Sequence, residues 1–294
     1  MATVRNDLAL APYSDPEMVF HRVAPALTRY ESAGTAWYQP YTADVTAITN
    51  RAALGAVTAN AVAAASKSFT CGEILSRQEM SYDQVRQGYR DLLSAEFAMA
   101  RLGKRAVSAA LETALATALM ANPVDKSASD NLPGEIEALA SDLADKGNGK
   151  IGLVLSPLAF GNLKADAEVK ARMTNTGVIL GQGGDARNVT KEQLAAVFGL
   201  DEVIVGPAYI WNQAAVAGGS KAALVVLPTE GLEPTEEAQY GRIYSYEFAV
   251  DGEFLPFSCE SFYNDINKSY NVDTVAKAAF VELNAGLKQA ITLF

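Results

Sequence analysis

Apolar residues recur with a helical period between residues 81 and 120. Four of them follow one another at four-residue intervals: Val107, Leu111, Leu115 and Leu119. Ser81 and Gln84 form a capping-box pattern at the start of this run, and Asn122, followed by a proline, ends it. The pattern predicts one continuous helix that is roughly 55 to 60 Å long at a rise of about 1.5 Å per residue. Gly103 inside the run indicates a bend or a close contact with another element.

Short apolar strands alternate with short helices between residues 151 and 213. The continuous apolar run from Ile151 to Leu155 is typical of a buried strand, and Ser156, followed by a proline, begins a helix. Thr190 to Gln193 forms a second capping box, and the helix that it begins ends at Gly199. A second apolar strand follows at Val203 to Gly206. This order predicts an α/β unit.

Further elements flank the α/β unit on both sides. A helix over Pro133 to Lys146 precedes it, and Ala222 to Leu227 predicts another buried strand. Arg242 to Val250 alternates as a strand with one aromatic side, which consists of Tyr244, Tyr246, Phe248 and Val250. The C-terminal sequence VDTVAKAAFVELNAGLKQAITLF predicts one or two final strands.

The first 77 residues lack the periodicity of the rest. Residues 1 to 34 contain three prolines and scattered apolar side chains, which predicts an extended arm that becomes ordered only against a neighbouring chain. From Thr35 to about Arg77 small, β-branched and aromatic residues predict two strands joined by a flexible tip. Because the middle of this segment has only small side chains, we expect an exposed hairpin without stable contacts in its own subunit.

Composition and charge narrow the range of functions. The chain has 294 residues, 49 % of them hydrophobic, which is enough for a substantial core. Its net charge of -10 argues against a protein that grips nucleic acid through its overall charge, although an acidic protein can still enclose DNA. We expect no secretion signal and no membrane span. The two cysteines lie far apart, which predicts neither a disulfide framework nor a metal site and favours a reducing cytoplasm.

The sequence contains few residues that could act in catalysis. His21 is the only histidine and lies in the predicted arm, where we expect a packing role. Cys71 and Cys259 are predicted to be small buried side chains. The loop from Gly181 to Asp185 resembles a phosphate loop but lacks the spacing and the lysine that a nucleotide site requires. The sequence therefore predicts no catalytic residue, no cofactor, no metal site and no enzyme.

Charged residues are unevenly distributed along the chain. On the predicted long helix, five cationic residues fall within an arc of about 100°: Arg86, Arg90, Arg101, Lys104 and Arg105. Acids dominate between Thr229 and Asp265, where Arg242 is the only cationic residue. We interpret the basic face as a candidate contact with acids of the same or an adjoining subunit. The alternative is an ordinary solvated helix face, because exposed ion pairs contribute little individually.

The order of these elements resembles that of a known family. Its most specific parts are SKSFTCGEILSRQEMSYDQV, which leads into the long helix, and LAAVFGLDEVIVGPAYIWNQ in the α/β unit, where it follows IGLVLSPLAFGNLKADAEVKARM. They resemble the Hong Kong 97-like (HK97-fold) major capsid proteins of tailed bacteriophages. The resemblance implies an α+β fold with an N-terminal arm (1–34), an E-loop (35–77), a peripheral domain with a long spine helix (78–150), an axial α/β domain (151–241) and return strands (242–294).

The resemblance also implies a function. It predicts a coat protein that assembles with itself into pentamers and hexamers of an icosahedral head, which encloses double-stranded DNA non-specifically. A separate scaffolding protein, or none, and a portal are the further partners implied, with assembly in the bacterial host cytoplasm and a final location in the virion. Lys67 lies near the E-loop and is another candidate for an inter-subunit contact, although it matches no crosslinking position of the family.

Two other functions stay open on the sequence alone. One is an encapsulin-like nanocompartment shell, which shares the fold and encloses a cargo enzyme. The other is a cytoplasmic α/β enzyme that uses the loop from Gly181 to Asp185.

Overall fold

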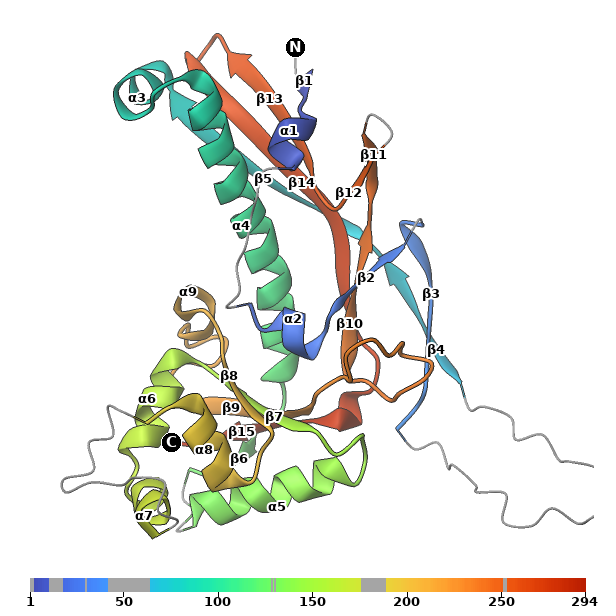
Figure 1. Cartoon of the computed structure of the whole chain (residues 1–294), viewed down its shortest axis with the longest axis vertical. Coiled ribbons are helices and arrows are strands. Elements are labelled where there is room, and N and C mark those ends of the chain that lie inside the picture. The colour runs from blue at the N-terminus through green and yellow to red at the C-terminus, as the bar shows by residue number, and fades with distance from the viewer. Residues whose placement is uncertain are drawn as a thin grey trace, which may run out of the picture.

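A computed structural model describes residues 3–10, 18–29, 31–41, 64–127, 129, 131–175, 189–250 and 253–294 of the chain. The described residues form two sheet-based halves, which the helix α4 (Leu92–Leu119) connects (Figure 1). One half contains a six-stranded sheet, and we call it the elongated half. The other contains a five-stranded sheet surrounded by helices, and we call it the α/β half.

The six-stranded sheet of the elongated half is mostly antiparallel. It comprises β1 (Thr3–Val4), β2 (Ala26–Arg29), β5 (Gly72–Ser81), β10 (Gly241–Tyr246), β13 (Ser258–Asn264) and β14 (Ser269–Glu282). Strands β13 and β10 pair with successive parts of one edge of β14, and β5 pairs with its other edge. β2 adds to β10 in parallel. The sheet therefore depends on one long strand near the C-terminal end of the chain.

The predicted long helix is two helices. The capping box at Ser81 is confirmed and begins α3 (Tyr82–Gly88). The chain is then extended at Tyr89, and Asp91 accepts a hydrogen bond from the backbone N–H of Ser94 at 2.7 Å, which begins α4. An aspartate in this position competes with helix continuation because its side chain satisfies an N–H of a new first turn. At about 1.5 Å per residue α4 is roughly 42 Å long, shorter than the sequence pattern predicted.

The apolar stripe on α4 packs as its spacing predicts. Val107, Leu115 and Leu119 are buried. Gly103 marks a close contact: a Cβ at this position would lie 2.3 Å from Oγ1 of Thr274 in β14. The helix therefore lies directly on the sheet of the elongated half (Figure 1).

The five-stranded sheet of the α/β half has the order β6-β15-β9-β7-β8. Its strands are β6 (Val124–Asp125), β7 (Ile151–Leu155), β8 (Glu202–Val205), β9 (Lys221–Val226) and β15 (Lys288–Thr292). The helices around it are α5 (Leu132–Ala144), α6 (Pro157–Ala165), α7 (Ala167–Asn175), α8 (Lys191–Phe198) and α9 (Ala208–Trp211). Every residue of β7 is buried, as expected for a strand covered on both faces.

Local signals in this half are confirmed. Ser156 caps α6 by accepting from the backbone N–H of Ala159, and Thr190 and Gln193 form a complete capping box on α8. Gly199 ends α8 in the left-handed conformation, with φ of 65°, which glycine adopts without the strain of a Cβ. The helix predicted from residue 133 and the strand predicted from residue 222 are also present, as α5 and β9.

The C-terminal part differs from its prediction in one place. The predicted strand over Arg242 to Val250 is interrupted at Glu247, which separates β10 from β11 (Phe248–Val250), and β11 pairs with β12 (Glu253–Leu255). Arg242 and Ile243 are both buried, so β10 has no solvated face in this part. The final sequence forms the two strands β14 and β15 with a short 3-10 helix, Ala285–Leu287, between them.

The N-terminal residues pack against their own chain, so the expectation of an arm ordered only by a neighbour is wrong. They form two one-turn helices, α1 (Asn6–Ala9) and α2 (Phe20–Val23), in addition to β1 and β2. Leu8, Val19 and Val23 are fully buried. Helices this short contain too few residues to show a period, which is why the sequence pattern did not reveal them.

The predicted hairpin is present at its base. β3 (Ala33–Tyr38) and β4 (Ala65–Thr70) form an antiparallel pair, and the predicted tip lies outside the described residues. The expectation that this segment lacks contacts in its own subunit is wrong, because Ala36 and Phe69 are buried and β5 belongs to the six-stranded sheet. Cys71 separates β4 from β5, where one continuous strand was expected.

Candidate assembly surfaces

A buried carboxylate on α4 joins the two halves to the N-terminal segment. Glu112 is fully buried and accepts hydrogen bonds from the backbone N–H groups of Val19 and Phe20, each at 3.0 Å. It also accepts from Nε1 of Trp211 in α9 at 2.6 Å. A buried carboxylate is tolerated when such donors surround it. Glu112 therefore fixes α2, α4 and α9 relative to one another.

Two more charged residues of α4, Glu96 and Lys104, bind the N-terminal residues around α1. Nη1 of Arg5 donates to Glu96 at 2.9 Å and Nη2 donates to Asp7 at 2.6 Å, which lowers the pKa of the Asp7 carboxyl. Lys104 is only 2 % exposed, and its Nζ donates to the carbonyl of Ala9 at 2.5 Å. Burial lowers the pKa of Lys104, because the charged form loses hydration.

The base of the β3–β4 hairpin rests on the sheet of the elongated half. Phe69 stacks on Tyr244 of β10, with ring centroids 4.5 Å apart. Nζ of Lys67 donates to the carbonyl of Glu282 at 2.6 Å, so this candidate residue is tied to its own chain at the end of β14. Trp37 in β3 is 56 % exposed. The hairpin therefore combines an anchored base with an outward aromatic side chain.

The five cationic residues of the predicted basic face do not share one helix face. Arg86 lies in α3, Arg90 lies in the link between the helices, and Arg101 lies on α4, all of them exposed. Lys104 is buried, as described above, and the Arg105 guanidinium lies over the Tyr209 ring at 4.7 Å, joining α4 to α9. The break between α3 and α4 removes the common helical axis on which the predicted arc depended. A role of these residues in contacts between subunits stays a prediction.

The acidic residues also occupy several places. Glu237 accepts from Nδ2 of Asn148 at 2.5 Å and from the backbone N–H of Thr229 at 2.8 Å, which closes the connection between β9 and β10. Glu260 lies in β13 of the elongated half. These two acids therefore lie on different elements of the chain.

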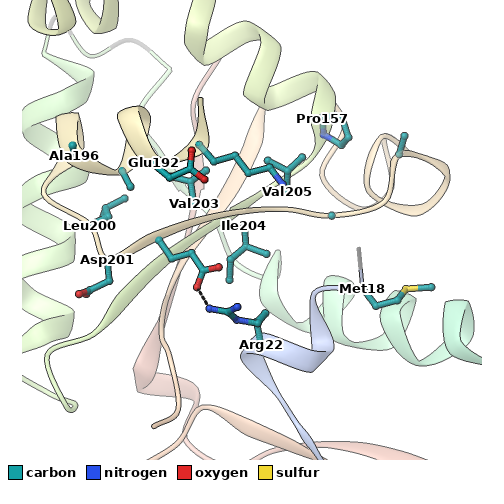
Figure 2. Close-up of a pocket in the computed structure, with 15 residues that line it drawn as sticks. Met18, Arg22, Pro157, Glu192, Ala196, Leu200, Asp201, Val203, Ile204 and Val205 are labelled. Carbon is teal, nitrogen blue, oxygen red and sulfur yellow. Dashed lines mark hydrogen bonds and ion pairs between the residues drawn. The ribbon is translucent and has the colours of Figure 1, made fainter. Parts of the chain in front are cut away.

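A groove of about 670 Å³ lies between α2, α8 and β8. Figure 2 looks onto the outer edge of β8, with Ala196 and Glu192 of α8 on one side and Met18 and Arg22 on the other. Arg22 forms an ion pair with Glu202 at one wall of the groove. β8 is the last strand of its sheet, so no described strand pairs with this edge.

The residues with catalytic potential are dispersed. His21 is exposed and lies beside the Phe20 ring, at a centroid distance of 4.1 Å. Cys71 and Cys259 are buried as predicted, and burial raises the pKa of both thiols. The loop from Gly181 to Asp185 lies outside the described residues. Among the described residues we find neither a cluster of three potential metal ligands nor a helix long and apolar enough to cross a membrane.

Sequence reasoning missed Glu112 and Glu96. A signal existed: Glu112 directly follows Leu111 and lies three residues before Leu115, beside the apolar stripe of α4. An acid in such a position is buried only if donors from elsewhere reach it, and those donors come from segments distant in sequence. The pattern of α4 alone cannot identify them.

The fold of the chain is similar to that of several solved structures. No protein-family model and no curated protein sequence matches the chain. Among solved structures, a phage-related protein from Bordetella bronchiseptica RB50 matches with a TM-score of 0.68 at 15 % identity, covering 99 % of this chain and 97 % of that one. The capsid structure of cyanophage P-SCSP1u matches with a TM-score of 0.57 at 11 % identity, over 94 % and 88 % of the two chains.

The chain has the HK97-like capsid fold. The α+β class predicted from the sequence is therefore confirmed. A virus-like particle from Pyrococcus furiosus matches as well, with a TM-score of 0.53 at 9 % identity, covering 97 % of this chain and 95 % of that one. Since each of these matches includes both sheet-based halves, the likeness extends to the whole architecture.

Proposed function

We propose that this chain is the major capsid protein of a tailed bacteriophage and assembles with itself into pentamers and hexamers of an icosahedral shell. The observation that carries the proposal is the match to a phage capsid structure over 94 % of the chain, which includes both halves and the connecting helix. On this proposal residues 1–34 are the arm, 35–77 the E-loop, 78–150 the peripheral domain, 151–241 the axial domain and 242–294 the return strands. Within the range 78–150, β6 and α5 pack in the α/β half, so the boundary of the axial domain belongs before them.

The contacts within the subunit suit this role. A shell subunit contacts several neighbours at once, and these contacts keep their geometry only if its two halves have a fixed relative orientation. The hydrogen bonds of Glu112 and the contact between Gly103 and β14 hold α4 to both halves. The anchored base of the β3–β4 hairpin lets that segment project from a fixed point toward a neighbouring subunit.

The remaining parts of the proposal concern partners and location. The net charge of -10 supports a shell that encloses double-stranded DNA without gripping it through overall charge. We propose that the protein acts in the virion after assembly in the host cytoplasm, with a portal and, where one is needed, a separate scaffolding protein. We propose no catalytic activity for it.

Purification of the protein after expression on its own tests the proposal. Electron microscopy and sedimentation should show closed shells or ring-shaped capsomers. Particles isolated from a phage-producing host should contain double-stranded DNA. A protein that stays monomeric at every concentration and ionic strength, and never enters particles in such a host, would contradict the proposal.

The same experiment also tests an alternative function, an encapsulin-like compartment. The match to the virus-like particle from Pyrococcus furiosus supports this alternative. Shells that contain a co-purifying protein cargo and no nucleic acid would favour an encapsulin-like compartment. Because the capsid fold is common to both functions, the contents of the shell, and not its shape, distinguish them.

A further inference from the structure

We propose that Asn284 makes the direction of the β3–β4 hairpin depend on the angle between the two halves of the subunit. Asn284 lies in the stretch 283–287, which runs from β14 in the elongated half to β15 in the α/β half. A second stretch, 227–240, runs from β9 in the α/β half to β10 in the elongated half. The coupling is a property of the single subunit, and only its use in contacts with neighbouring copies rests on the proposed function.

The side chain of Asn284 binds the hairpin and the second stretch together. It is 4 % exposed. Its Oδ1 accepts a hydrogen bond from the backbone N–H of Tyr41 at 3.3 Å, and its Nδ2 donates to the carbonyls of Gln39 at 3.1 Å and Gln239 at 2.9 Å. A carboxamide has one acceptor oxygen and two N–H donors, so it can satisfy these three backbone groups at once. Gln39 and Tyr41 follow the end of β3, and Gln239 lies in the stretch 227–240.

Further contacts hold the end of β3 at the same place. The backbone N–H of Gln39 donates to the carbonyl of Pro234 at 2.7 Å. The Tyr41 ring covers Gly286, because a Cβ at this glycine would lie 2.5 Å from Cζ of the ring. The end of β3 therefore lies beside the loop that follows β9 (Figure 1). We call this set of contacts the joint, and its members are Gln39, Tyr41, Pro234, Gln239, Asn284 and Gly286.

The other strand of the hairpin is attached to the elongated half. Phe69 of β4 stacks on Tyr244 of β10. Nζ of Lys67 donates to the carbonyl of Glu282, the last residue of β14. β3 and β4 pair along their full lengths, so the base of the hairpin moves as one piece. Its β4 side therefore follows the sheet of the elongated half, whereas the end of its β3 side follows the joint.

The stretch 283–287 is itself held at both ends. At one end, the backbone N–H of Leu283 donates to the carbonyl of Tyr240 at 2.8 Å. At the other end, Nζ of Lys288 donates to the carbonyl of Ala118 in α4 and lies 3.6 Å from Oε1 of Glu282. Networks of hydrogen bonds and packed side chains carry coupling between distant parts of a protein. A change in the angle between the halves should therefore turn the hairpin or break the joint.

Hydrogen exchange of the full-length, dissociated subunit tests the coupling as a double-mutant cycle. Glu112→Gln weakens the contacts of α4 with α2 and α9, so it loosens the angle between the halves. We expect this change to speed exchange of the Gln39 amide about tenfold, but less than about twofold when Asn284→Ala is also present. Unchanged exchange at Gln39 in Glu112→Gln would overturn the inference, and so would the same acceleration with and without Asn284→Ala.

Two controls separate the coupling from a general loss of stability. Val169 is fully buried in the core of the α/β half, and Val169→Ala should leave exchange at Gln39 unchanged. Asn271 is a buried amide at the other end of β14, and Asn271→Ala should preserve the effect of Glu112→Gln. An acceleration by Val169→Ala as large as that by Glu112→Gln would show that exchange follows global unfolding, which would overturn the inference.

Tyr41→Ala is a second, milder disruption of the joint. Tyr41 is partly exposed, so its replacement should leave the subunit folded even where Asn284→Ala does not. We expect Tyr41→Ala to reduce the effect of Glu112→Gln on exchange at Gln39 by about half or more. An effect that stays undiminished in Tyr41→Ala would count against the joint. Because these subunits are not assembled, the result does not depend on whether shells form, and shell formation tests the proposed function separately.

Discussion

Replacement of Glu112 should separate the N-terminal segment from the rest of the subunit. The Glu112 carboxylate is fully buried and accepts from three N–H donors, which are the backbone groups of Val19 and Phe20 at the start of α2 and the side chain of Trp211. In Glu112→Ala these donors lose their acceptor, and each buried donor left without a partner costs about 1 to 3 kcal/mol. Relief of the buried charge offsets part of this cost, so we expect a net destabilisation of about 3 to 5 kcal/mol.

Glu112→Gln provides a second, milder perturbation. It keeps the volume of the side chain, but its NH₂ group must face at least one of the three donors, and we expect a loss of about 1 to 3 kcal/mol. Asp142→Asn, at an exposed position of α5, is the control and should change stability by less than about 0.5 kcal/mol.

Urea unfolding of the dissociated subunit, followed by circular dichroism, measures these differences. Trp211→Phe alone and combined with Glu112→Gln completes a double-mutant cycle, for which we expect a coupling energy above about 1 kcal/mol. Limited proteolysis should release the N-terminal fragment faster in Glu112→Ala than in the wild type. Unchanged stability and proteolysis in Glu112→Ala would refute the role that we assign to this carboxylate.

Three further predictions concern the sheet and its surfaces. Gly103→Ala should destabilise the subunit by about 1 to 3 kcal/mol, because the added Cβ would collide with β14. The control Gly161→Ala, at a helix position with open space, should stabilise the subunit by about 0.5 to 1 kcal/mol. Equal effects of the two variants on thermal unfolding would contradict the close contact at Gly103. Phe69→Ala should cost about 3 to 5 kcal/mol and make the β3–β4 hairpin sensitive to protease, and a hairpin that stays resistant would disprove its anchoring through this ring. Arg86→Glu combined with Arg90→Glu should reduce assembly in the absence of DNA, more strongly at low salt, where charges are least screened; normal empty shells that fail only to retain DNA would reassign these residues to the genome.

Local elements of this fold could be predicted where their signals are contained in a few consecutive residues. The capping boxes at Ser81 and Thr190, the buried strand at Ile151 and the left-handed end of α8 at Gly199 belong to this group. Each depends on chemistry within about one helical turn or one strand. The order of such elements was also sufficient to indicate the fold.

Features that depend on distant partners could not be predicted. The N-terminal helices are one turn long, and their stability comes from burial beside α4 and, for α2, from the carboxylate of Glu112. The break before Asp91 was concealed because apolar residues continue on both sides of it. Lys104 was assigned to a surface face, since a helical projection does not show that α1 covers this position.

A reconstruction of assembled particles by cryo-electron microscopy tests the central claim most directly. The account predicts a closed icosahedral shell in which the α/β halves, with their five-stranded sheets, surround the five-fold and six-fold positions. The elongated halves should extend outward from these positions toward neighbouring capsomers. Particles without icosahedral order, or shells in which the elongated halves surround these positions, would contradict the account.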